Sequence, residues 1–186
     1  MKRSPLHPWK VLRERTVYRA APWIRVSLQD VRLPNGRRVP DYHRVEMPEY
    51  AVIVACARDG RILFERQYKH GLGAVALFLP GGLVVRGERP LVAARRELLE
   101  ETGYRAAHWK SLGSFICNSN YGCGRAHFFL ATGARCVASP RSGDLEEMEI
   151  LLLSRAQALV ALRQGKIRAV SAALGLCLVL RAGIGG

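Results

Sequence analysis

The chain has 186 residues, of which 49% are apolar, and 29 lysine and arginine residues against 15 acidic ones give it a formal net charge of +14. This length suits one domain with a small extension, and the apolar content excludes a wholly disordered chain. The charge attracts polyanions but says nothing about fold. The longest uncharged stretch, Gly71–Val85, is shorter than the roughly 18–20 apolar residues of a membrane-spanning helix. We therefore expect no membrane partner and, because no apolar run follows the first basic residues, a cytoplasmic protein.

The first half of the chain contains runs of β-branched and aromatic residues, which favour strands. Pro34-Asn35-Gly36 and Asp59-Gly60 are turn signals between such runs. Strands are predicted, in chain order, at Val11–Arg19, Trp23–Leu33, Arg37–Met47, Tyr50–Ala57, Arg61–Lys69 and Val75–Leu79. Pro48 lies between the third and the fourth of these runs. We therefore expect a small N-terminal β-sheet unit, residues 1–47, ahead of a main domain, residues 48–186.

The pattern changes to a helical period after the Pro80-Gly81-Gly82 turn. Pro90 suits the first turn of a helix, where its missing N–H costs nothing, and Gly103 suits a left-handed stop after Thr102. The later elements are predicted as strands at Ser111–Cys117, Arg125–Ala131 and Met148–Leu153 and as helices at Arg155–Arg163 and Arg168–Arg181. Strands, one helix, more strands and two final helices indicate an α/β or α+β sandwich.

Five cysteines are present, and no two of them have the CxxC spacing of a zinc or redox motif. Their odd number argues against a disulfide framework. We expect most of them to pack as small core residues, with Cys123, which lies in a glycine-rich stretch, as the candidate for exposure.

The predicted helix from Pro90 to Thr102 carries the clearest chemistry. At about 100° per residue, Glu97, Glu100 and Glu101 share one face, opposite an apolar face. Like charges three and four positions apart repel each other and destabilise an isolated helix, so a group of opposite charge is expected beside them. Mg²⁺ prefers oxygen ligands and is usually shared between carboxylates and substrate phosphates. A glutamate-rich face that is only solvated is the alternative interpretation.

Two neighbouring features favour a cation site at this face. Arg96 lies four residues before Glu100, so it can pair with a glutamate and hold it in position. The glycines at 81 and 82 let backbone groups approach a metal ion or a phosphate closely. One loop and one helix face can therefore assemble an oxygen-lined site.

The spacing of these residues follows a known pattern. A glycine at 82 is followed by Glu88, then by Arg-Glu-Leu at 96–98, Glu-Glu at 100–101 and Gly-Tyr at 103–104. This segment resembles the Nudix box, with Tyr104 in place of the usual aliphatic residue, and the chain is similar to the Nudix hydrolases. The resemblance implies an α/β fold, an α/β/α sandwich with a mixed sheet, in which the box forms a loop, a helix and a second loop that bind Mg²⁺ or Mn²⁺.

The resemblance also implies a role for each residue of the box. Glu97 and Glu101 would be metal ligands, Glu100 would share or support them in catalysis, and the carbonyl oxygen of Gly81 would be a further ligand. Arg96 would contribute to catalysis by orienting the glutamates, and Glu88 would assist through the water around the metal. Cations in such a site neutralise a pyrophosphate and lower the pKa of the water that attacks phosphorus.

Two runs outside the box, Glu65–Gly71 and Leu79–Gly82, resemble the ADP-ribose pyrophosphatase branch of the family, as does the N-terminal unit with its Pro-Asn-Gly turn. In that branch the unit is a small sheet exchanged between the subunits of a homodimer, where it helps to build the nucleotide pocket. The resemblance thus implies a homodimer in which Gln67 and Lys69 contact the substrate.

The same resemblance gives the N-terminal aromatics a role. Trp23 or Tyr42 would stack on the nucleotide base in the partner subunit's site. Both are alternatively ordinary core or interface residues.

A glutamate in a loop beyond the box often acts as the catalytic base in this branch. The acidic loop Ser142–Glu149 precedes a predicted strand and suits that role. Glu146 aligns best, with Glu147 and Asp144 as alternatives. An acidic loop that is only solvated is the competing interpretation.

The resemblance predicts a metal-dependent enzyme that cleaves ADP-ribose or a related nucleoside diphosphate sugar into a nucleoside monophosphate and a sugar phosphate. ADP-ribose-preferring members usually carry a proline shortly after the box, where this chain has Asn118–Gly122, so the sugar and the base stay open. An RNA 5′-end or cap-like pyrophosphate is an alternative substrate, suggested by the +14 charge but not favoured, because no aromatic-basic RNA motif is visible. A nucleotide-binding regulator without turnover is the third interpretation, although every glutamate of the box is present.

Overall fold

The computed structural model describes residues 6–141 and 147–181. The chain divides into two compact units. One comprises Met1–Pro48 together with Ile116–Gly124, and the other comprises Glu49–Phe115 and Arg125–Gly186.

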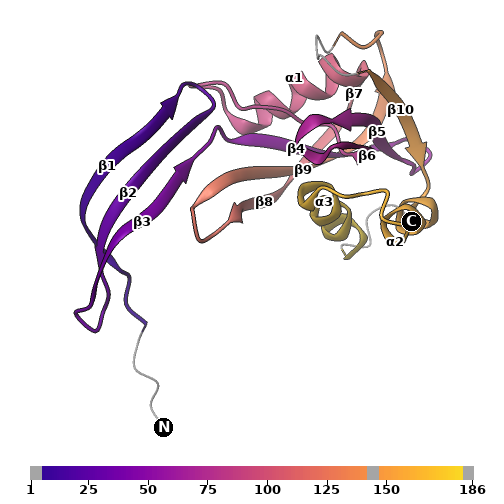
Figure 1. The fold of residues 1–186 in the computed structure, drawn as a ribbon. Helices are drawn as coiled ribbons and strands as arrows, with labels where there is room; N and C mark the ends of the chain where they lie inside the picture. The colour runs from indigo at the N-terminus through magenta and orange to yellow at the C-terminus, as the bar shows by residue number, and fades with distance from the viewer. Residues whose placement is uncertain (1–5, 142–146, 182–186) are drawn as a thin grey trace. The chain divides into compact units, whose positions relative to one another are not determined.

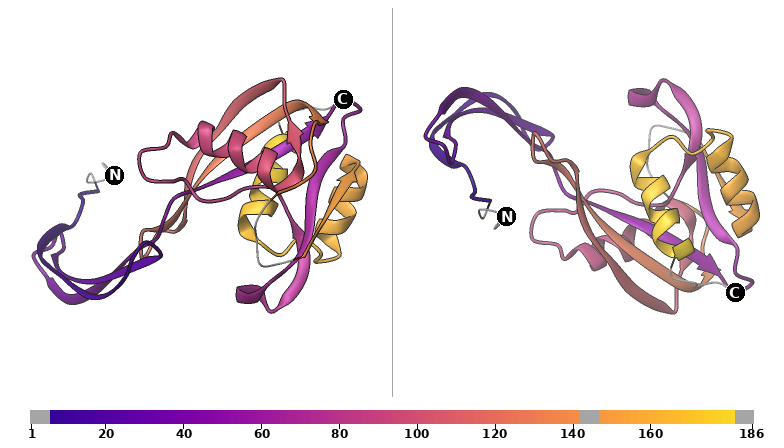
Figure 2. Two further views of the ribbon diagram at one scale, coloured as in Figure 1. Left: turned by 90° about the horizontal axis from the view of Figure 1, so that it is seen from above. Right: turned by 90° about the horizontal axis from the view of Figure 1, so that it is seen from below.

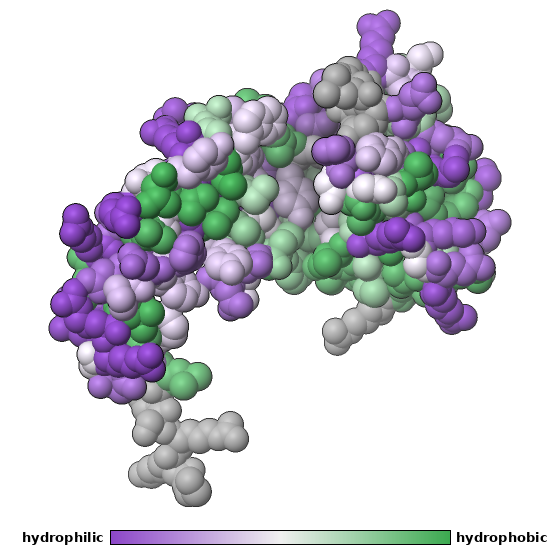
Figure 3. Space-filling model, viewed as in Figure 1, coloured by the Kyte–Doolittle hydropathy of each residue, from purple (hydrophilic) through white to green (hydrophobic). Residues whose placement is uncertain are grey.

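The N-terminal unit is built on a three-stranded antiparallel sheet (Figure 1). Its strands are β1 (Lys10–Ala20), β2 (Ile24–Arg32) and β3 (Arg38–Glu46), in that spatial order. Every residue of β1 before Ala20 is exposed. Figure 3 shows apolar side chains at the surface of this unit among polar ones, and the large exposed apolar residues here include Trp9, Val17, Tyr18 and Trp23. A sheet with so much apolar surface in water is a candidate for contact with another chain.

A seven-stranded sheet forms the centre of the larger unit, with the order β10-β5-β4-β9-β7, β6 beside β5 and β8 beside β9. β4 and β9 are parallel, whereas β4–β5, β5–β6, β5–β10 and β7–β9 are antiparallel, so the sheet is mixed. The strands are β4 (Tyr50–Ala57), β5 (Ile62–Lys69), β6 (Ala74–Phe78), β7 (Tyr104–Arg105), β8 (His108–Asn118), β9 (Cys123–Cys136) and β10 (Met148–Leu153).

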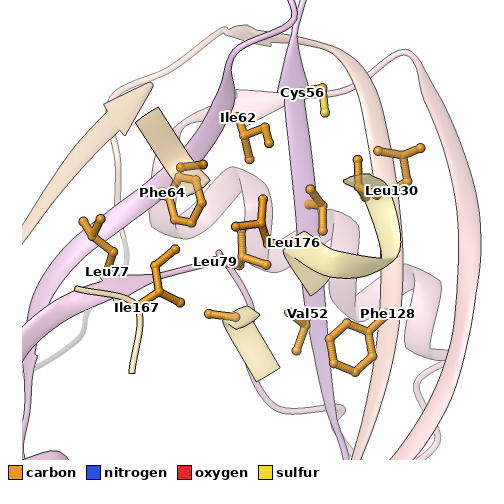
Figure 4. Close-up of a cluster of buried hydrophobic side chains, with 14 of the residues drawn as sticks. Val52, Cys56, Ile62, Phe64, Leu77, Leu79, Phe128, Leu130, Ile167 and Leu176 are labelled. Carbon is orange, nitrogen blue, oxygen red and sulfur yellow. The ribbon is translucent and has the colours of Figure 1, made fainter. Parts of the chain in front are cut away.

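Helices cover both faces of this sheet (Figure 2). One face carries α1 (Pro90–Thr102), and the other carries α2 (Arg155–Arg163) and α3 (Val170–Arg181). The central strand β4 explains this layering, because its side chains alternate and all of its interior positions are buried. Its odd-numbered residues, such as Ile53, pack in the α1 cluster, and its even-numbered residues, such as Val54, pack in the cluster of Figure 4 with Phe64, Phe128 and Leu176.

The predicted α/β/α sandwich with a mixed sheet and a separate small N-terminal sheet is confirmed. The bounds of α1, α2, β4 and β10 are those predicted. β8 and β9 are longer than predicted. β7 was not predicted, because a strand of two residues is too short to show an alternating pattern. A 3₁₀ turn, His70–Leu72, also follows β5.

The expectation that most cysteines lie in the core is wrong. Only Cys56 is buried, whereas Cys117, Cys136 and Cys177 are exposed and Cys123 is half-buried. Cys117 and Cys136 lie at the ends of long strands, and Cys177 lies on the outer side of α3. None of the five forms a disulfide bond. In the described part of the chain, no helix has the length and apolar character needed to cross a membrane.

Candidate active site

The Pro80-Gly81-Gly82 turn is fastened to the central strand of the sheet. The amides of Ile53 and Ala51 donate to the carbonyls of Pro80 and Gly82, each at 2.8 Å. Between these two bonds, the amide of Gly81 donates to the Glu101 carboxylate at 2.8 Å. A Cβ atom at position 81 would lie 2.1 Å from the carbonyl oxygen of Ala51, so the approach of this turn to β4 requires a glycine.

The second glycine of the turn makes room for a carboxylate. A Cβ atom on Gly82 would lie 2.4 Å from the carboxyl carbon of Glu97 and 2.5 Å from each of its oxygens. The Glu97 side chain therefore lies directly over the backbone of this turn. Gly81 and Gly82 thus bring Glu101 and Glu97, which are one helical turn apart, to the same stretch of main chain.

Arg96 joins three of the box glutamates. Its Nη1 donates to Glu97 Oε1 at 2.7 Å and to Glu100 Oε2 at 3.1 Å. Its Nε and Nη2 donate to the two oxygens of Glu88 at 3.2 and 3.1 Å, and Nη2 also donates to the carbonyl of Leu83 at 3.0 Å. Bidentate pairs of this kind fix orientation as well as charge, so these contacts allow Arg96 to hold the three carboxylates in place.

This arrangement shifts the titration of its members. The hydrogen bonds to Glu88, followed by those to Glu97 and Glu100, raise the pKa of the Arg96 guanidinium above its usual value. The hydrogen bond from Arg96 in turn holds the pKa of the Glu88 carboxyl below its usual value. Arg96 and Glu88 therefore both stay ionised through the neutral pH range.

The donor set fits a hard divalent cation. Three carboxylates, those of Glu88, Glu97 and Glu100, pair with the one guanidinium of Arg96. A fourth, that of Glu101, accepts from the Gly81 amide, so negative charge is in surplus beside the glycine turn. Oxygen donors of this type are the ligands that Mg²⁺ and Mn²⁺ prefer. Within residues 6–141 and 147–181, however, no three acidic, histidine or cysteine side chains are gathered closely enough to hold a metal ion by themselves. Arg96 is the group that holds the carboxylates in this arrangement.

Strand β5 places a row of polar side chains on the α1 face of the sheet. Leu63 packs in the α1 cluster, and by strand alternation Glu65, Gln67 and Lys69 point to the same side. Glu65 and Gln67 are 1% and 4% exposed, and the Gln67 amide donates to Glu65 at 3.1 Å. The sequence analysis gave Glu65 no role, although an acidic residue inside an apolar strand pattern is the signal that marks it.

The other residues named from the sequence lie elsewhere. Trp23 and Tyr42 belong to the N-terminal unit, where Trp23 is 61% exposed. The Tyr42 hydroxyl donates to the carbonyl of Asn120 at 2.6 Å, and its ring meets the edge of Trp9 at 5.5 Å between centroids. Glu146 and Asp144 lie outside the described residues, and Glu147 is exposed just before β10.

Comparison with known families agrees with this geometry. A family profile described as the NUDIX domain matches residues 47–170. The chain belongs to the Nudix family. A second profile, the nucleoside diphosphate sugar hydrolase N-terminal domain, matches residues 9–45, ahead of the Nudix domain.

Several curated relatives are similar to this chain. A CMP-5′-(N-acetyl-N-hydroxy-3-aminopropyl)phosphonate hydrolase of Streptomyces rubellomurinus is 34% identical over 96% of this chain and 84% of its own length. An ADP-ribose pyrophosphatase of Bacillus subtilis is 30% identical over 69% of this chain and 71% of its own length. An ADP-ribose pyrophosphatase of Mycobacterium tuberculosis is 32% identical over 73% of this chain and 65% of its own length.

A solved structure described as an ADP compounds hydrolase superposes with a TM-score of 0.84, at 24% identity over 97% of this chain and 96% of its own. At that identity the likeness shows the fold, which is the one predicted. The expectation of a Nudix pyrophosphatase, acting on a nucleoside diphosphate linked to another group, is confirmed by the family and its relatives.

Proposed function

We propose that this Nudix enzyme uses Mg²⁺ or Mn²⁺ to hydrolyse ADP-ribose or a related nucleoside diphosphate sugar, releasing a nucleoside monophosphate and a sugar phosphate. The observation that carries the proposal is the set of box carboxylates held by Arg96 and by the Gly81-Gly82 turn. The N-terminal profile of nucleoside diphosphate sugar hydrolases and the two ADP-ribose pyrophosphatase relatives support this substrate class.

The proposed metal ligands are Glu97, Glu100, Glu101 and the carbonyl oxygen of Gly81. When bound, the cation supplies charge neutralisation for the pyrophosphate and a lowered pKa for water. The chain's own groups set the geometry: the Gly81 amide fixes Glu101, and Arg96 fixes Glu97 and Glu100. Gln67 and Lys69 are proposed substrate contacts, because they lie on the α1 face of the sheet.

The bond that breaks is the P–O bond of the anhydride. The oxygen of water bonds to phosphorus as the bridging oxygen leaves with the second phosphate. The proton lost by the water passes to a carboxylate, for which Glu146 is proposed, with Glu147 and Asp144 as alternatives.

The N-terminal unit is proposed to mediate homodimerisation and to supply Trp23 or Tyr42 to the base. Support comes from the exposed apolar residues of β1 and of the turn that follows it, which a second copy would cover. A cytoplasmic location is proposed on separate grounds, because five cysteines that form no disulfide suit a reducing compartment.

A second candidate substrate is a nucleoside monophosphate joined to a phosphonate. The specific support is the Streptomyces relative, whose similarity extends over 96% of this chain. The scissile linkage would again be P–O–P, so the same carboxylates would serve and only the groups beyond the anhydride would differ.

A substrate panel with product identification tests these proposals. The panel contains ADP-ribose, other nucleoside diphosphate sugars, a CMP-linked phosphonate and a 5′-capped RNA, each assayed with Mg²⁺, with Mn²⁺ and with a chelator. The proposal predicts metal-dependent release of a nucleoside monophosphate and a sugar phosphate. Faster cleavage of the CMP-linked phosphonate would select the second candidate, and preference for the capped RNA would contradict both.

A further inference from the structure

A cavity lies on the flank of α1, within the larger unit. It has a volume of about 480 Å³ and is lined by residues of α1 and of the segment from β7 to the start of β8. Three of its lining residues are arginines, Arg95, Arg96 and Arg105, and the largest of the others is Trp109. No acidic side chain lines it within the described part of the chain.

This cavity is separate from the carboxylate site. At about 100° per residue, Arg95 lies roughly 200° around the helix from Glu97, so the two side chains leave α1 on nearly opposite sides. Arg96 lies between them, because it lines the cavity and also bonds Glu97 and Glu100. A ligand in the cavity would thus contact the back of the same helix that carries the box.

The cavity has an aromatic wall that is fixed in place. Trp109 is half-buried, and its ring meets the edge of Phe129 at 6.5 Å between centroids. The guanidinium of Arg95 lies 5.8 Å from the centroid of the Trp109 ring. This guanidinium lies over the indole ring, so a planar base stacks on Trp109 by taking its place, and the displaced guanidinium can then bind the phosphate.

Positive charge is concentrated at the other side of the cavity. Arg105 stands directly opposite Arg135 in the antiparallel β7–β9 pair, so the two side chains lie on the same face of the sheet. Like charges directly opposite each other destabilise a strand pair, and a bound anion removes that repulsion. An arginine fork also matches phosphate oxygens in geometry.

We propose that this cavity is a second nucleotide site, which binds a nucleoside 5′-phosphate with its phosphate on Arg105 and Arg95 and its base against Trp109. Its volume lies within the range of about 300–1,000 Å³ that small-molecule sites occupy, which suits a mononucleotide and not a nucleic acid strand. The assignment is independent of the substrate that the carboxylate site cleaves.

Tryptophan fluorescence tests the site directly. The chain has three tryptophans, at 9, 23 and 109, so a Trp9→Phe/Trp23→Phe background leaves Trp109 as the reporter. AMP, adenosine, inorganic phosphate and a short 5′-phosphorylated RNA are titrated in the presence of a chelator, which suppresses metal-dependent binding and turnover at the carboxylates. The proposal predicts that AMP changes the Trp109 fluorescence in a saturable way. The affinity for AMP should be about tenfold or more above those for adenosine and phosphate, because only AMP contacts both the arginines and the indole.

Arginine variants in the same background identify the contact. Arg105→Ala should weaken AMP binding by about tenfold or more, since a charge-assisted bond to phosphate is lost. Arg163→Ala is the matched control, because it removes an exposed arginine from α2 on the other face of the sheet, and it should leave the affinity within about twofold. Trp109→Phe removes the fluorescent reporter, so its AMP binding is measured by calorimetry. This variant should still bind AMP, because an aromatic ring is kept.

Three results would overturn the proposal. These are a Trp109 signal that AMP does not change, an Arg105→Ala affinity equal to that of the Arg163→Ala control, and RNA binding far tighter than AMP binding with the same arginine dependence. None of these results would contradict the proposed hydrolysis, which the metal-dependent substrate panel measures separately.

Discussion

The amide of Gly81 donates a hydrogen bond to the carboxylate of Glu101 at 2.8 Å, and this bond joins the turn after β6 to the last turn of α1. Glu101 is only 8% exposed, so its carboxylate is held by the main chain and not by solvent. The box is therefore fixed at two places, by this bond and by Arg96.

Gly82→Ala tests the contact between the turn and Glu97. The added methyl would lie 2.4 Å from the Glu97 carboxyl carbon, so the carboxylate must move away. We expect kcat to fall by roughly a hundredfold, because misplacing a catalytic group by about 1 Å costs that much. Gly71→Ala is the matched control for steady-state kinetics, since nothing lies within 4 Å of its Cβ position. Unchanged kcat in Gly82→Ala would place Glu97 outside the catalytic cluster.

The pH dependence of stability tests the Arg96 cluster. The pKa of Glu88 in the folded state is held below its ordinary value of 4.5, mainly by the hydrogen bond from Arg96. The ionised Glu88 therefore stabilises the fold above that value, and its contribution is lost as the pH falls through the lowered folded pKa.

Removing the guanidinium should weaken this dependence. Arg96→Ala should lower the thermal midpoint at neutral pH and have a smaller effect below pH 4.5, where Glu88 begins to protonate in the unfolded chain. Calorimetry from pH 3 to 7 measures the difference. An Arg96→Ala effect that grows toward acid pH would contradict the sign of the Glu88 shift.

Substitution of two buried leucines distinguishes the contribution of α1 packing from that of the core on the other face of the sheet. Leu98 of α1 and Leu176 of α3 are both fully buried, each in its own cluster. Each leucine-to-alanine change should cost about 2–5 kcal/mol of unfolding free energy. When kcat is measured well below the melting temperature, only Leu98→Ala should also lower it, because this change loosens the helix that carries the box. Equal loss of kcat in both variants would mean that α1 has no special role.

Much of the fold was predictable because its signals are local. Pro90 and Gly103 mark the ends of α1, and the continuous apolar run of β4, buried at all its interior positions, stands at its predicted bounds. The spacing of the box glutamates likewise depends on neighbouring positions of one helix.

The contacts that fix the site were not predictable, because they join segments far apart in sequence. The approach of the Pro80-Gly81-Gly82 turn to Ala51, and the bond from Gly81 to Glu101, follow from strand pairing that no single run of residues encodes. The burial of Glu65 beside Gln67 has the same origin, because it depends on which face of β5 α1 covers. Trp109 and Arg105, which carry the second-site proposal, had no motif at all.

Trp23→Ala tests the proposed stacking on the base. Base stacking on an aromatic ring is worth about 1–3 kcal/mol, so KM should rise by roughly tenfold while kcat stays nearly constant. Trp23→Phe should stay close to the wild type, since it keeps a ring at this exposed position. An unchanged KM in Trp23→Ala would remove Trp23 from the binding site and leave Tyr42 as the candidate.

Turnover of Glu101→Gln at saturating Mg²⁺, on the substrate selected by the panel, tests the central claim most directly. Glutamine can still accept the bond from the Gly81 amide, so the thermal midpoint should change little, and Asp59→Asn in an exposed turn serves as the control. The account predicts a fall in kcat on the order of a thousandfold or more, because a metal that is worth several kcal/mol in the transition state loses a charged ligand. Near-normal turnover by a correctly folded Glu101→Gln would contradict it.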